Sequence, residues 1–77
     1  MNKDKFISLL ALITADVIYK IIEKYGYEEN EAISKFHRSE LYSVLEREET
    51  KVWHYSSEMI LELFDREMKG NLEFPEV

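Results

Sequence analysis

Residues 53 to 57 place a tryptophan, a histidine, a tyrosine and two serines next to one another, a set of side chains that could carry chemistry. An imidazole among aromatic rings could move protons or hold a ligand, and a serine becomes a nucleophile when a base activates it. A catalytic site needs several such groups to converge, and this segment offers His54 as its single acid–base group. We therefore interpret the segment as structural: its aromatic side chains pack on a small core, and His54 is partly exposed and takes no part in a site.

The same stretch contains the start of a helix. Ser56 can cap a helix over residues 56–69, and Tyr55 then has the spacing to pack on Ile60 as a hydrophobic staple. Trp53 is expected in an extended connector whose alternate side chains face the core. The predicted structural anchors are Trp53, Tyr55, Ser56 and Ile60.

Metal binding and unassisted catalysis find little support elsewhere. The chain has no cysteine, and neither His37 nor His54 has a histidine or carboxylate three or four residues away within one predicted helix. The acidic clusters at 28–31 and 46–49 fall at helix ends, where water readily solvates them, whereas a raised carboxylate pKa requires burial or a forced like-charge pair. No glycine-rich phosphate loop is present. We expect no catalytic residue, no metal and no cofactor, and hence no enzyme.

Length and composition favour one small soluble domain. A chain of 77 residues buries only about 60% of its unfolded surface. The net charge of -6 disfavours nucleic acid and anionic lipid as partners. The apolar run at 6–15 is interrupted by Asp16, well short of the roughly 20 residues of a membrane span, and no cleavage site follows it. A cytoplasmic location is expected, consistent with the lack of cysteine.

Periodicity predicts an all-α fold, a small bundle of about four helices. Gly26 is expected to end the first helix and Ser39 to cap the third. Two glycines and one proline leave little room for the turns of a sheet. The predicted helices span 4–25, 29–37, 40–47 and 56–69. Residues 1–70 form a single helical domain and 71–77 an extended tail, because Pro75 cannot continue a helix.

The last helix shows a regular division into two faces. Its predicted inward stripe comprises Ile60, Leu63, Phe64 and Met68. On the solvent-exposed face, Glu62 is expected to pair with Arg66 and Asp65 with Lys69, at the spacing of four residues that stabilises helices.

The first helix is apolar over more than half of its circumference, wider than the stripe of an ordinary surface helix. Such a helix is either surrounded by its own fold or shared with another chain, and the sequence leaves both open. If it is shared, the expected contact residues are Phe6, Leu10, Ile13, Val17 and Ile21.

The second and third helices could be mistaken for a helix-turn-helix motif. The candidate reading helix would offer four glutamates to the phosphates, at positions 40, 46, 48 and 49, with Arg47 as its single cation. Recognition helices need the opposite charge. A DNA-binding regulator is therefore disfavoured.

The stretch 31–68 also resembles a group of small all-helical bacterial proteins of unknown function, mainly from gut Firmicutes. Their shared pattern runs through most of residues 6 to 69 and is structural in character. In that group a serine more often caps the second helix, where this chain has Glu28. Some members are encoded beside toxin–antitoxin-like genes, which implies an antitoxin-like or accessory binding role. The matching residues are Glu31, Ala32, Phe36, Ser39, Tyr42, Leu45, Glu49, Thr50, Lys51, Trp53 and Ser56.

Two functional hypotheses remain, with DNA binding third. The first is a protein–protein interaction module that dimerises or binds a partner through the first helix, with a homo-oligomer expected. The second is a small ligand-binding domain or enzyme with its site around Trp53, His54 and Tyr55.

Overall fold

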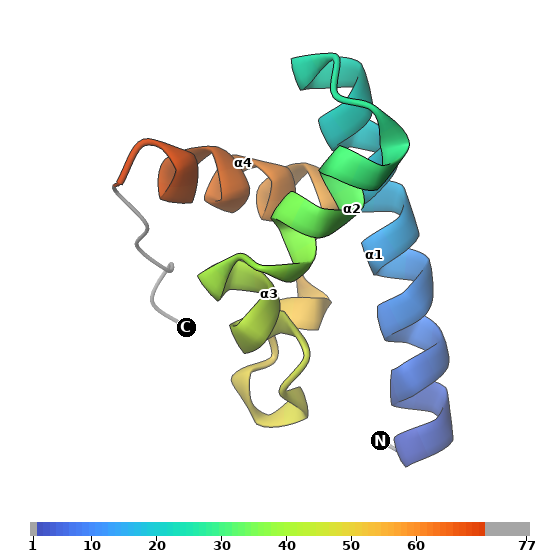
Figure 1. The fold of residues 1–77 in the computed structure, drawn as a ribbon. Helices are drawn as coiled ribbons and strands as arrows, with labels where there is room; N and C mark the ends of the chain where they lie inside the picture. The colour runs from blue at the N-terminus through green and yellow to red at the C-terminus, as the bar shows by residue number, and fades with distance from the viewer. Residues whose placement is uncertain (1, 71–77) are drawn as a thin grey trace.

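The computed structural model describes residues 2–70 and shows an all-helical fold (Figure 1). The elements are α1 (Lys3–Tyr25), α2 (Glu29–His37), α3 (Glu40–Leu45), the 3₁₀ turns η1 (Glu48–Thr50) and η2 (Val52–His54), and α4 (Ser57–Met68). Residues 2–70 contain no strand, so the predicted fold class is confirmed. The predicted helix bounds differ from these by two residues at most. The tail predicted at 71–77 lies outside the described residues.

Local signals set the helix ends. The Ser39 hydroxyl accepts a hydrogen bond from the Tyr42 N–H at 3.1 Å, and the Ser56 hydroxyl accepts one from the Met59 N–H at 3.1 Å. Each bond satisfies one of the free N–H groups of a first helical turn, as predicted. Glu28 precedes α2 without a capping hydrogen bond from its side chain.

The turn after α1 depends on a glycine. Gly26 adopts the left-handed conformation at φ 72°, and its N–H donates to the Ile22 carbonyl at 2.9 Å. A residue with a Cβ is strained in this conformation, so glycine suits the position. The chain then reverses, and α2 folds back across the C-terminal half of α1 (Figure 1).

α1 is the longest element and lies along one side of the molecule (Figure 1). It packs against both α2 and α4, which hold its C-terminal half. Its N-terminal half extends beyond α2, with η2 as its neighbour there. One long helix therefore has well-covered and poorly covered stretches.

The core lies where the four helices meet. Phe36 of α2 and Phe64 of α4 are both fully buried, and their rings meet edge to face with centroids 5.9 Å apart. Edge-to-face ring pairs add to the stabilisation from apolar burial. The other buried apolar residues of this cluster are Val17, Ile18, Ile21, Ala32, Leu41, Leu45, Val52, Ile60 and Leu63.

Three local expectations were wrong. Met68 is 48% exposed, because α4 ends there beyond the edge of the core. Asp65 does not pair with Lys69 but reaches α1, where it accepts hydrogen bonds from Lys24 and Tyr25. α3 ends at Leu45, two residues before the predicted end. The predicted pair of Glu62 and Arg66 does form, at 2.7 Å.

Candidate functional site

Trp53 is held on both sides by the fold. Its indole Nε1–H donates to the Glu48 carbonyl at 2.8 Å, and its ring meets Phe6 of α1 edge to face at 5.8 Å between centroids. Buried tryptophans commonly satisfy their N–H in this way. Trp53 thus ties the η1–η2 segment to the N-terminal half of α1.

The sequence predicted an extended segment around Trp53, but this prediction was wrong. The structure forms the 3₁₀ turn η2 there. Lys51 precedes it in the left-handed conformation at φ 58°, which reverses the chain direction between η1 and η2. The turn leaves His54 exposed beside a shallow hollow of about 500 Å³, whose other lining residues are Glu48, Glu49, Lys51 and Trp53. The hollow brings one imidazole together with acidic side chains but encloses none of them.

These positions predict different costs for neighbouring substitutions. Trp53→Ala should lower the free energy of unfolding by about 2–3 kcal/mol, somewhat below the cost for a fully buried ring, because Trp53 is partly exposed. His54→Ala should change it by less than about 0.5 kcal/mol, as is usual for exposed sites. Urea unfolding monitored by circular dichroism measures both. A large loss in the free energy of unfolding for His54→Ala would contradict the interpretation that this exposed side chain has no structural role.

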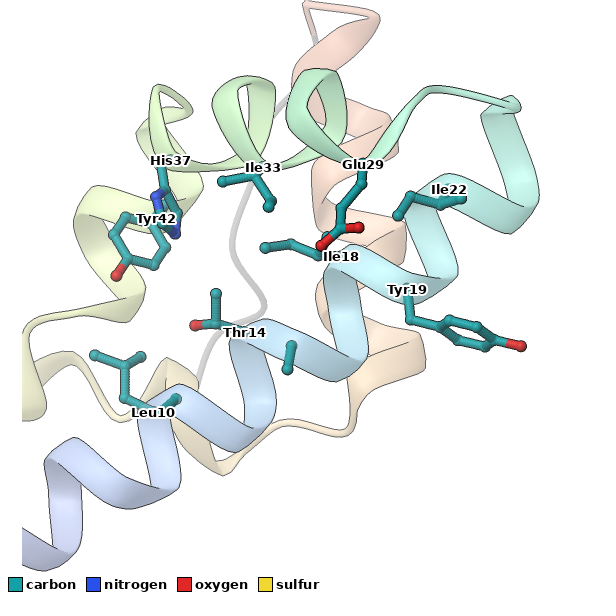
Figure 2. Close-up of a pocket in the computed structure, with 11 residues that line it drawn as sticks. Leu10, Thr14, Ile18, Tyr19, Ile22, Glu29, Ile33, His37 and Tyr42 are labelled. Atoms are coloured by element: carbon teal, nitrogen blue, oxygen red, sulfur yellow. The ribbon is translucent and has the colours of Figure 1, made fainter.

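The larger concave feature is a groove of about 690 Å³ between α1 and α2, which ends at α3 (Figure 2). Leu10, Thr14 and Ile18 of α1 lie along its floor, and Ile33 of α2 faces them. Ala11, Ala15, Tyr19, Ile22, Glu29, His37 and Tyr42 complete the lining. Most of these side chains are apolar, so the groove suits an apolar occupant better than a polar substrate.

Polar atoms are few in this groove. Glu29 and His37 are exposed at its α2 side. Burial, and secondarily the Glu46 carboxylate, raises the pKa of the Tyr42 hydroxyl. The groove therefore contains no convergent set of charged groups of the kind that catalysis requires.

Thr14 is the exception inside the groove. Its side chain points from α1 toward the space below α2 (Figure 2). The residue is only 9% exposed, yet among residues 2–70 its Oγ1 is the single buried side-chain nitrogen or oxygen without a hydrogen-bond partner. Such an atom costs free energy unless something supplies a partner. The chain's own atoms cover this Oγ1, so its cost lies within the fold and it is not a contact point for an occupant of the groove.

The apolar surface continues beyond the groove along α1. Ile7 is 53% exposed, Leu12 71% and Tyr19 59%, and all three belong to this one helix. At 100° per residue Leu12 and Tyr19 lie on one side of the helix and Ile7 on the other side of the exposed Ala11 and Ala15, so the exposed apolar surface wraps around part of α1. We call this surface, together with the groove, the α1 face; it comprises Ile7, Leu10, Ala11, Leu12, Thr14, Ala15, Ile18, Tyr19, Ile22, Ile33 and Tyr42.

Of the five residues expected from the sequence to contact a partner, only Leu10 belongs to the α1 face. Phe6, Val17 and Ile21 are buried in the core of the single chain and cannot reach a partner while the chain is folded. Leu10 and Ile13 are half-buried, and Leu10 alone among the five lines the groove. Other parts of the same chain bury Phe6, Val17 and Ile21, and Trp53 of η2 is the neighbour that covers Phe6.

A second cluster of titratable groups joins α1 to α4. Asp65 accepts hydrogen bonds from the Lys24 ammonium and the Tyr25 hydroxyl. Burial and the Asp65 carboxylate raise the pKa of Tyr25 to about 12, so the phenol stays protonated at neutral pH. Because all three groups satisfy one another, the cluster joins two helices rather than forming a reactive site.

Within the described part of the chain, no group of three or more histidine, aspartate or glutamate residues is placed to hold a metal ion. No helix in that part is long and apolar enough to cross a membrane. No family model matches the sequence, and neither a curated protein nor a solved structure matches it significantly.

Proposed function

We propose that the protein is a protein–protein interaction module that docks an amphipathic helix on the α1 face. The observation that carries this proposal is the exposure of three large apolar side chains on the helix that also forms the floor of the groove. Ile7, Leu12 and Tyr19 are each more than half exposed. A small ligand in the groove would leave most of this surface in water, whereas a helix could cover it.

The dimensions of the α1 face agree with this mode of recognition. α1 has 23 residues and is about 34 Å long at 1.5 Å per residue. Helix-in-groove recognition uses an apolar stripe of the ligand helix laid along such a surface. The wall formed by α2 would fix the position of the docked helix.

The finer proposal is an antitoxin-like or accessory subunit, which rests on the resemblance described above. The net charge of -6 supports a basic partner, since complementary charge speeds and orients association. Part of this acidic charge lies on η1 and α4, which do not line the groove. These elements would remain available for a basic surface after a helix had docked.

The small-ligand alternative around Trp53, His54 and Tyr55 has less support. The Trp53 N–H is already satisfied within the chain, and His54 lies in an open hollow.

Photo-crosslinking in the native host tests the interaction proposal. A photoreactive amino acid replaces Leu12, and a matched control places it at Glu62, whose side chain is about half exposed on α4. We expect a discrete crosslinked protein from position 12 and none from position 62. No product from position 12, or equal products from both positions, would refute the proposal.

A further inference from the structure

We infer that the helix docked on the α1 face is α1 of a second copy of this chain, in an antiparallel two-fold pair. This inference rests on the proposed function, because it names the occupant of the same surface. Most soluble oligomers are symmetric homo-oligomers, and a two-fold dimer needs one surface that is complementary to itself. The α1 face meets this requirement in the size of its side chains and in its charge.

The order of large and small exposed side chains along α1 is the same from the N-terminus as from the C-terminus. Ile7, Ala11, Ala15 and Tyr19 are all exposed and follow one another at intervals of four residues, so they form one row along α1. The row is large, small, small, large, and it is symmetric about Ile13, near the middle of the helix. An antiparallel two-fold pair centred there sets Ala11 against Ala15 of the other copy, and Ile7 at the level of Tyr19. Small residues at the centre let the two helices approach closely.

The charges at the edge of the row are complementary in the same arrangement. Lys5 and Glu23 are eighteen residues apart, which at 3.6 residues per turn is five full turns, so both lie on the same side of α1. A two-fold axis perpendicular to the helices keeps each flank on its own side. Lys5 of one copy therefore comes to the level of Glu23 of the second copy, and symmetry repeats the pair. In a parallel pair the two-fold axis runs along the helices and moves this flank to the opposite side of the second copy, so Lys5 and Glu23 would not meet.

The centre of the proposed contact is uncharged, although each copy carries a net charge of -6. Residues 6–15 contain no charged side chain, so the centre of the contact brings together two neutral surfaces. The antiparallel arrangement also places the positive N-terminal end of each helix dipole beside the negative C-terminal end of the other.

Disulfide trapping tests both the second copy and its orientation, because the natural chain has no cysteine. Ala11→Cys and Ala15→Cys are made as separate full-length proteins, then mixed in equal amounts under mild oxidation. We expect the mixed disulfide to form roughly tenfold faster than either self-disulfide, since only the facing pair lies within the Cα separation that a disulfide tolerates. Self-disulfides that form as fast as the mixed product would overturn the antiparallel register.

Oligomeric state gives an independent test on variants without cysteine. Sedimentation velocity of the full chain should show a dimer that dissociates at least about tenfold more readily after Ala15→Arg, because this change puts a charge at the centre of the apolar contact. The matched control is Ser43→Arg, an exposed position on α3, which should leave the dimer unchanged. A monomer at every concentration, or equal effects of the two variants, would overturn the inference.

Photo-crosslinking at position 12 separates failure of this inference from failure of the proposed function. A crosslinked product made of two copies supports both. A product with a different protein, from a chain that sediments as a monomer, overturns the second copy but keeps the interaction module. No product at all overturns both.

Discussion

Phe36→Ala is expected to leave the protein largely unfolded at room temperature. Phe36 is fully buried, and its ring contacts Phe64 at 5.9 Å, Tyr42 at 5.4 Å and His37 at 6.4 Å between centroids. These contacts join α2, α3 and α4 in one cluster. Replacing a buried phenylalanine by alanine costs about 3–5 kcal/mol, because apolar contact is lost and a cavity remains. A chain of this size has a total stability of only a few kcal/mol.

Circular dichroism and urea unfolding of a dilute sample measure this effect without the contribution of association. The matched control is Met68→Ala, a large apolar residue that is 48% exposed at the end of α4. It should change the free energy of unfolding by less than about 1 kcal/mol. If Phe36→Ala unfolds cooperatively with a loss as small as that of the control, the ring cluster is not the centre of the fold.

The ends of the helices could be predicted from the sequence because the signals are local. Ser39 and Ser56 cap the helices that follow them, and Gly26 takes the left-handed conformation after α1. Each of these interactions joins residues within four positions of one another. Such contacts depend little on how the helices pack, so a single sequence suffices to predict them.

Contacts between distant residues could not be predicted in the same way. Asp65 has Lys69 at helical spacing, but α4 passes close enough to α1 for Lys24 and Tyr25 to compete for the carboxylate. The partly buried contact with two donors is favoured over an exposed pair within one helix. Likewise, the alternation around Trp53 suggested a strand-like connector, whereas the Thr50 hydroxyl bonds to the Val44 and Arg47 carbonyls and favours a tight turn.

The sequence predicted the broad apolar circumference of α1 but not which of its residues the fold covers. Periodicity showed that α1 is apolar around more of its circumference than one covering layer needs, and the structure leaves part of that circumference exposed. Which part is covered depends on where α2 and α4 lie, and hydrophobicity alone does not distinguish Val17, which is buried, from Leu12, which is exposed. The unpartnered hydroxyl of Thr14 had no signal in the sequence, because threonine inside a helix usually finds a local partner.

Glu67 makes a contact between helices that the sequence also gave no reason to expect. Its carboxylate accepts hydrogen bonds from the backbone N–H groups of Glu40 at 2.9 Å and Leu41 at 2.8 Å. Ser39 satisfies the next N–H, that of Tyr42. Together, the two side chains supply acceptors for three of the four N–H groups that the first turn of a helix leaves free. α3 has only six residues, so its stability depends strongly on these contacts.

Glu67→Ala should therefore lower the free energy of unfolding by about 1.5–3 kcal/mol, because two hydrogen bonds to a charged acceptor are lost. Glu67→Gln keeps one acceptor oxygen and should give an intermediate loss. Glu62→Ala is the matched control on the same helix, since it removes an exposed ion pair with Arg66 that is worth about 0.5 kcal/mol or less. Urea midpoints rank the three variants. Hydrogen exchange should become faster at both amides, of residues 40 and 41, in Glu67→Ala, at one of them in Glu67→Gln and at neither in Glu62→Ala. Unchanged exchange at those two amides would mean that α3 holds its first turn without α4.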